Sequence, residues 1–103
     1  MDSFKIYYGE ARFGSRELIE TNKKGLIKLE YYGTKNVLQE DSVEYGIEIV
    51  KKEYKNKQFI EESNSISNIV QNEKEMEELI MLLKRNKVTP IGLEDVIGDL
   101  AKK

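Results

Sequence analysis

The sequence contains no cysteine and no histidine, and it has only one proline. Without cysteine the chain has no disulfide, no thiolate nucleophile and no zinc–thiolate site. Without histidine it lacks the side chain whose unperturbed pKa suits acid–base catalysis near neutral pH. Ser-His-Asp and Cys-His sites are therefore excluded, and an enzyme built on this chain would have to rely on carboxylate, Lys and Tyr side chains alone.

Long apolar runs and a strong net charge are also missing. No apolar run approaches the ~20 residues needed to cross a bilayer, and the N-terminal MDSFKIYYGEAR lacks the basic-then-apolar order of a signal peptide. The formal net charge of −2 provides no overall field that would attract nucleic acid or acidic lipid. We therefore expect a cytoplasmic protein without a membrane partner.

The residues that are present suffice for one core. The 103 residues are 39% hydrophobic and 35% charged, with nine aromatics (six Tyr and three Phe), whereas disordered chains combine low hydrophobicity with high net charge. A chain of this length is expected to form a single domain, residues 1–103.

Alternating apolar and polar residues predict four strands within residues 3–62. They cover residues 3–13, 26–32, 43–50 and 58–62, and the third is the clearest, because Val43, Tyr45, Ile47 and Ile49 face opposite to Glu44 and Glu48. Gly9 and Gly14 indicate a bulge or a turn, and Asn56 indicates a hairpin turn. Residues 63–72, rich in Ser and Asn, read as a loop or a single helical turn. The pattern leaves the structure of residues 15–25 and 34–42 undecided.

Two amphipathic helices are predicted at about residues 73–86 and 90–101. Asn72 and Glu75 have the capping-box spacing at the start of the first, and Asn86 reads as its left-handed stop. Thr89 is the expected N-cap of the second, with Pro90 as its first helical residue. Apolar stripes at i, i+3, i+4 and i+7 give each helix a side to bury. These elements predict an α+β fold, in which an antiparallel sheet of about four strands carries the two C-terminal helices packed on one face.

Three segments carry a resemblance to a known family. YGIEIVK at 45–51, the passage through residues 59–72, and LIMLLKRNKVTPIGLEDVIGDL at 79–100 resemble a small family of uncharacterised bacterial proteins of about this chain's length. The family occurs in anaerobic spore-forming Firmicutes. Its recurring pieces are a Tyr-Gly-Ile strand and a Val-(Ser/Thr)-Pro-(Ile/Leu)-x-Leu-x-Asp-(Val/Ile) turn and helix, matched by residues 45–47 and 88–96. The resemblance implies no known activity.

Tyrosines on the outer face of the sheet are the first candidate site. In the pairs Tyr7-Tyr8 and Tyr31-Tyr32 the two residues must face opposite sides, which places Tyr7 and Tyr32 on the outer face. Outer tyrosines are enriched at protein interfaces, but they also pair across strands and simply stabilise a sheet. The sequence leaves both interpretations open.

A basic hairpin end is the second candidate site. Lys51, Lys52, Lys55 and Lys57 surround Tyr54, and together these residues could contact phosphates and stack one base. The alternative is a solvated hairpin end, in which lysines also discourage edge-to-edge strand pairing.

Carboxylates on the second helix are the third candidate. Glu94, Asp95 and Asp99 could hold a divalent ion through oxygen ligands. Acidic residues in the first turn of a helix also interact favourably with its dipole, and no calcium-binding loop motif is present. We therefore expect neither a metal nor another cofactor.

By elimination, the favoured function is a non-enzymatic protein-interaction or regulatory module of the cytoplasm. Its expected partner is another protein or a second copy of the chain in a homodimer. The first alternative is a nucleic-acid-binding accessory protein that uses residues 51–57, although nucleic acid is the less favoured partner. The second is a carboxylate- or metal-dependent enzyme.

Overall fold

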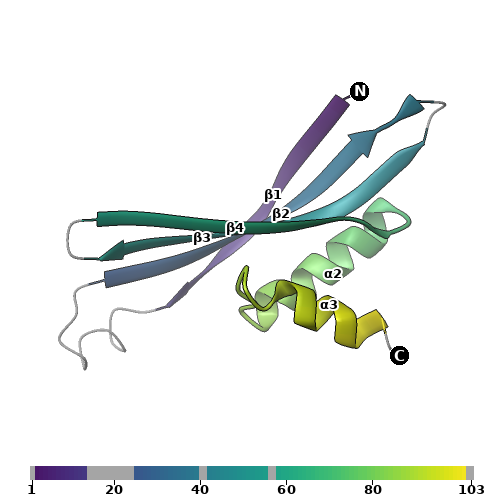
Figure 1. Cartoon of the computed structure of the whole chain (residues 1–103). Coiled ribbons are helices and arrows are strands. Elements are labelled where there is room, and N and C mark those ends of the chain that lie inside the picture. The colour runs from purple at the N-terminus through teal and green to yellow at the C-terminus, as the bar shows by residue number, and fades with distance from the viewer. Residues whose placement is uncertain (1, 14–24, 40–41, 56–57, 102–103) are drawn as a thin grey trace.

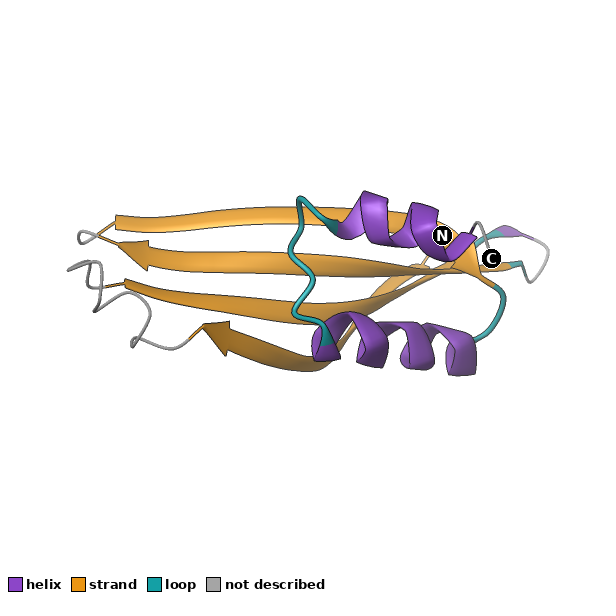
Figure 2. Ribbon diagram, turned by 90° about the horizontal axis from the view of Figure 1, so that it is seen from below, coloured by secondary structure: helices purple, strands orange, loops and turns teal. Residues whose placement is uncertain are grey.

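The computed structural model describes residues 2–13, 25–39, 42–55 and 58–101. One antiparallel sheet in the order β1-β2-β3-β4 is followed by two helices on the same face (Figure 1, Figure 2). This confirms the α+β fold expected from the sequence. The elements are β1 (Asp2–Phe13), β2 (Gly25–Val37), β3 (Val43–Lys55), β4 (Gln58–Val70), α2 (Glu73–Arg85) and α3 (Leu93–Ala101).

The molecule is elongated, with principal extents of 54 × 31 × 18 Å. The helices cover only one part of the sheet, and the strands extend past them at the end where β1 connects to β2 and β3 to β4 (Figure 2). In the described part of the chain, no element covers the opposite face (Figure 1). That uncovered face is called the outer face below.

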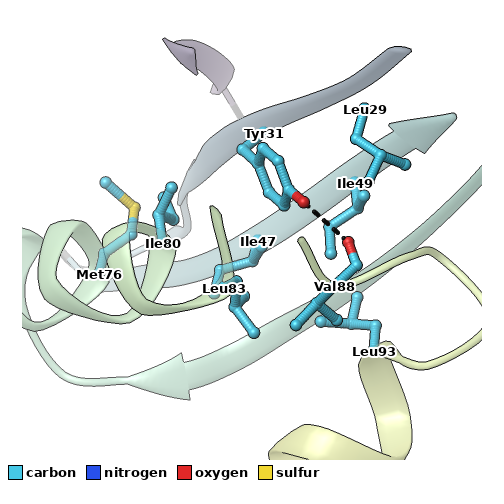
Figure 3. Close-up of a cluster of buried hydrophobic side chains, with 9 residues drawn as sticks. All are labelled: Leu29, Tyr31, Ile47, Ile49, Met76, Ile80, Leu83, Val88 and Leu93. Carbon is cyan, nitrogen blue, oxygen red and sulfur yellow. Dashed lines mark hydrogen bonds between the residues drawn. The ribbon is translucent and has the colours of Figure 1, made fainter. Parts of the chain in front are cut away.

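The core lies between the sheet and the helices (Figure 3). Alternation along β2 and β3 turns one set of side chains toward the helices, and the apolar stripe of α2 packs on them. The Tyr31 hydroxyl donates a hydrogen bond of 3.0 Å to the backbone carbonyl of Val88, which joins the centre of the sheet to the turn between the helices. The buried cluster consists of Leu29, Tyr31, Ile47, Ile49, Met76, Ile80, Leu83, Val88 and Leu93.

The strands are longer than the sequence pattern indicated. The prediction that they lie within residues 3–62 is wrong, because β4 continues to Val70 through residues expected to form a loop or helical turn. Serine and asparagine suggested a loop, but β4 is an edge strand whose outward positions tolerate polar side chains, and pairing with β3 keeps it extended. β2 and β3 likewise run past their expected ends at residues 32 and 50.

Two glycines permit close approach rather than ending strands. At Gly33, a Cβ atom would lie 2.8 Å from side-chain atoms of Met76 and Tyr8, so the missing side chain lets α2 pack directly on β2. At Gly46, a Cβ atom would overlap the backbone carbonyl of Ile66. There, residues 67–69 of β4 bulge opposite this single residue of β3, and Asn68 has φ 57°.

Hydrogen bonds define both ends of α2. Asn72 Oδ1 accepts from the Glu75 N–H at 2.9 Å, and Glu75 in turn accepts from the Gln71 N–H at 3.1 Å. Asn86 is the C-cap with φ −91°, so its expected left-handed conformation is wrong. Lys87 takes that role with φ 51°, and the N–H groups of residues 87 and 88 bond to carbonyls 84 and 83 in a Schellman arrangement.

The second helix starts later than expected. Residues 90–92 form a turn, and the α-helix begins at Leu93 rather than at Pro90. Thr89 Oγ1 accepts from the Gly92 N–H at 3.2 Å, which satisfies a backbone donor at this helix start. The Pro90 carbonyl accepts from Asn64 Nδ2 at 3.1 Å and ties the turn to β4.

Candidate functional site

Tyr7 and Tyr32 meet on the outer face. They are direct partners in the β1–β2 ladder, and their ring centroids lie 5.5 Å apart at an angle of 57°. A bulge at Tyr8–Gly9, where Gly9 has φ 120°, follows this pair and was anticipated from Gly9. Tyr7 remains 52% exposed. The cross-strand pairing is therefore present, and one ring of the pair still presents a broad surface.

A lysine and a glutamate complete this part of the face. Lys5 Nζ lies 4.3 Å from the Tyr32 ring centroid and 2.7 Å from Glu48 Oε1. The hydrogen bond to Glu48 is the main reason that the pKa of Lys5 lies above its usual value. Both contacts hold the ammonium group beside the tyrosines, so we call Lys5, Tyr7, Tyr32 and Glu48 the tyrosine cluster.

Glu30 is the most enclosed charged residue described, with only 7% of the residue exposed. Its carboxylate accepts from the Tyr32 hydroxyl at 3.0 Å and lies 2.9 Å from Lys52 Nζ and 3.3 Å from Lys28 Nζ. Burial pushes its pKa upward, but the hydrogen bonds from Lys52, Tyr32 and Lys28 together outweigh this and hold it below its usual value. Glu30 therefore stays ionised and fixes the Tyr32 ring.

The described residues of the predicted basic hairpin end do not share one surface. Lys51 pairs with Leu29 on the helix side of the sheet, whereas Lys52 lies on the outer face beside Glu30. Tyr54 is 53% exposed on the outer face, directly opposite Phe59 of β4. The side chain of Lys55, together with Asn56 and Lys57, lies outside the described residues.

A different set of basic residues gathers around Tyr54. Arg12, Lys28, Lys52, Tyr54 and Phe59 line a hollow of about 190 Å³ on the outer face. These residues come from all four strands, so only the register brings them together. Arg12 also forms a two-point contact with Glu10, with distances of 3.0 and 3.3 Å.

The carboxylates of α3 belong neither to the tyrosine cluster nor to the hollow around Tyr54. Glu94, Asp95 and Asp99 are exposed, and within residues 2–13, 25–39, 42–55 and 58–101 no group of three or more acidic side chains is arranged to hold a metal ion. Among the described helices, none is long and apolar enough to cross a membrane.

Sequence reasoning missed Lys5, Glu30, Arg12 and Phe59. Each was one polar or aromatic residue in an alternating strand, and such a residue shows its partners only when the register of neighbouring strands is known. The one signal available was the pair Lys28 and Glu30 on β2, because opposite charges at i and i+2 lie on the same face of a strand and suit a row of cross-strand ion pairs.

Comparison with known proteins gives one match. Residues 13–103 match the model of a family of unknown function (DUF6514), which covers all the described elements except most of β1. No curated protein and no solved structure matches the chain.

Proposed function

The chain belongs to the DUF6514 family of unknown function, and we propose that it is a non-enzymatic protein-interaction module of the cytoplasm. The tyrosine cluster on the outer face would form the centre of its binding surface. One observation carries the proposal: a half-exposed tyrosine stands, braced by neighbours, on a sheet face that no described element covers.

The cluster has the properties of an interface anchor. Tyrosine provides a large contact area with a polar end, and few rotatable bonds are lost when it is buried. Tyr7 packs against Tyr32, which Glu30 and Lys5 hold in place. Side chains that are already held in place lose less conformational entropy when they bind, so the free-energy cost of binding is smaller. Lys5 and Glu48 would provide the polar rim around the anchor.

The partner is proposed to be another protein or a second copy of the chain. A homodimer that joined two outer faces would be isologous, with the same residues contributed by both copies. The bacterial origin implied by the Tyr-Gly-Ile and Val-Thr-Pro-Ile motifs stays a prediction.

Matched substitutions test the proposal. Tyr7 and Tyr54 are equally exposed on the same face, so Tyr7→Ala is the test variant and Tyr54→Ala its control. Affinity capture from nuclease-treated cell extract, quantified by mass spectrometry, should lose a specific protein by about tenfold or more with Tyr7→Ala only, because interface anchors contribute roughly 2 kcal/mol or more. A homodimer would instead appear in light scattering and revert to monomer in Tyr7→Ala.

The proposal fails if folded Tyr7→Ala retains every captured protein and the oligomeric state of the wild type. Circular dichroism of each variant checks folding. The Tyr54→Ala control separates loss of this surface from a general effect of removing an exposed ring.

A further inference from the structure

We propose that the chain also binds single-stranded nucleic acid, on a basic band that wraps around the β1 edge. Within the described residues β1 pairs only with β2, so it forms one edge of the sheet. The basic band runs from the outer face across this edge to the end of α2. It consists of Arg12, Lys28, Lys52, Tyr54, Phe59, Lys84 and Arg85.

Two adjacent aromatic rings form the first part of the band. Tyr54 and Phe59 are direct partners across β3 and β4, they face the outer side, and they are 53% and 61% exposed. Flat exposed rings on an open sheet are platforms on which unpaired bases stack, whatever their sequence. Bases within a duplex are already stacked on one another, which is why the ligand is single-stranded.

Basic side chains line the same hollow as these rings and are more exposed than Glu30. The side chains of Lys28 and Lys52 are 29% and 31% exposed, whereas the carboxylate-bearing side chain of Glu30 beneath them is only 10% exposed. A ligand that approaches the outer face therefore meets these ammonium groups before Glu30. Two further carboxylates lie nearby on this face: Glu10 contacts Arg12 and Lys28, and the exposed Glu61 is the β4 partner of Lys52. Arg12 lines the same hollow and is more exposed than either lysine.

A second hollow continues the band on the helix side. Arg12 lines it together with Met81, Lys84 and Arg85, and its volume is about 350 Å³. Glu10 is the one carboxylate among its described lining residues, and Arg12 already engages it. Because Arg12 lines both hollows, a chain of phosphates can pass from one to the other around the edge of the sheet.

The helix end leaves its cations available. Backbone N–H groups of residues 86–88 bond to the carbonyls of residues 82–84, so the carbonyls at this end have partners without any lysine or arginine side chain. Lys84 and Arg85 can therefore turn toward a phosphate. The glutamates of α2 lie in its N-terminal half, at positions 73, 75, 77 and 78, away from this end of the helix.

The aromatic rings of the band lie far from those of the tyrosine cluster, although Glu30 contacts Tyr32 as well as Lys28 and Lys52. In the register, Tyr32 lies opposite Tyr7, whereas Leu26 lies opposite Tyr54. These two rows are six positions apart along β2, which is about 20 Å. Because Tyr7 tests one site and Tyr54 with Phe59 tests the other, failure of one proposal is distinguishable from failure of the other.

Fluorescence anisotropy with labelled oligodeoxythymidylate and oligouridylate tests the proposal. The wild type should bind at micromolar concentration in low salt. Tyr54→Ala/Phe59→Ala should weaken binding by about tenfold, and Tyr54→Leu/Phe59→Leu, which keeps apolar bulk but no flat ring, should weaken it similarly. Tyr7→Ala is the matched aromatic control and should bind as the wild type does.

Salt dependence tests the cations. Lys84→Gln/Arg85→Gln should make the slope of log K against log salt shallower by about 1.4, which is roughly 0.7 for each phosphate contact on a single strand. Lys74→Gln, at the other end of α2, is the control and should leave the slope unchanged. Binding of either oligonucleotide supports the site, and a preference between them identifies the sugar.

Three outcomes would overturn the proposal. The first is no binding of either oligonucleotide at micromolar protein in low salt. The second is wild-type binding by both folded aromatic variants. The third is equal binding of polyglutamate with the same salt slope, because this would indicate a surface that attracts any polyanion.

Discussion

Replacing Tyr31 by phenylalanine removes one buried hydroxyl and leaves the Val88 carbonyl without its partner. The Tyr31 side chain is fully buried, and its hydrogen bond to Val88 is 3.0 Å long (Figure 3). Loss of such a bond, with a buried acceptor left unsatisfied, costs about 1–3 kcal/mol. A loss of about 2 kcal/mol would lower the melting temperature by roughly 10 °C in a domain of this size.

The same substitution should change how stability depends on pH. Burial raises the pKa of Tyr31 to about 12, whereas a tyrosine in the unfolded chain titrates near 10. Between these values the folded state keeps a proton that the unfolded state releases, so stability falls as the pH rises from about 10 to 12, by up to roughly 3 kcal/mol. The phenylalanine variant lacks this contribution.

Urea denaturation of both proteins from about pH 8 to pH 12 measures the two effects. The stability difference between wild type and variant should be about 2 kcal/mol at pH 8 and should shrink as the pH rises above 10. Other groups that titrate in this range are common to both proteins and cancel in the difference. Tyr7→Phe, which removes an exposed hydroxyl, should change stability by less than about 0.5 kcal/mol. A Tyr31→Phe variant as stable as wild type, or a difference independent of pH, would refute the assignment.

Four further substitutions test other parts of the structure. Glu30→Gln should lower the stability of the fold by about 1–3 kcal/mol at neutral pH, because Lys28 and Lys52 lose a charged acceptor. The pKa of Glu30 lies below its usual value, so the stability that its charge contributes is lost as the pH falls. The difference between the urea midpoints of wild type and variant should therefore close in acid. Gly46→Ala should cost about 2–4 kcal/mol in thermal melts because its Cβ would strike the β4 backbone, whereas Gly98→Ala, with open space around it, should stabilise by about 1 kcal/mol; equal effects would contradict the close approach at Gly46. Lys87→Gly should raise the melting temperature slightly, because a non-glycine residue at φ 51° costs about 1 kcal/mol and glycine does not. A large loss of stability would show that contacts of the lysine side chain outweigh this backbone penalty.

Local signals in the sequence were sufficient for the type of most elements but not for their ends. The spacing of Met76, Ile80 and Leu83 identified a helix and its buried side, and all three residues are fully buried. Residues 63–70 could not be assigned in the same way, because serine and asparagine in an edge strand look like a loop until the partner strand is known. The close approaches at Gly33 and Gly46 were also beyond prediction, because no local pattern distinguishes a glycine that ends a strand from one that lets a neighbouring element pack closely.

The sequence by itself determined an α+β chain with its helices last, the buried faces of β2, β3 and α2, and the absence of histidine and cysteine chemistry. It also placed Tyr7 and Tyr32 on the outer face, because alternation along a strand is a local property. Only the tertiary structure decided which residues meet across strands: Lys5 with Tyr32, Glu30 with Lys28 and Lys52, and Arg12 with both hollows. Register and helix placement depend on contacts between residues far apart in the chain, and no local pattern encodes them.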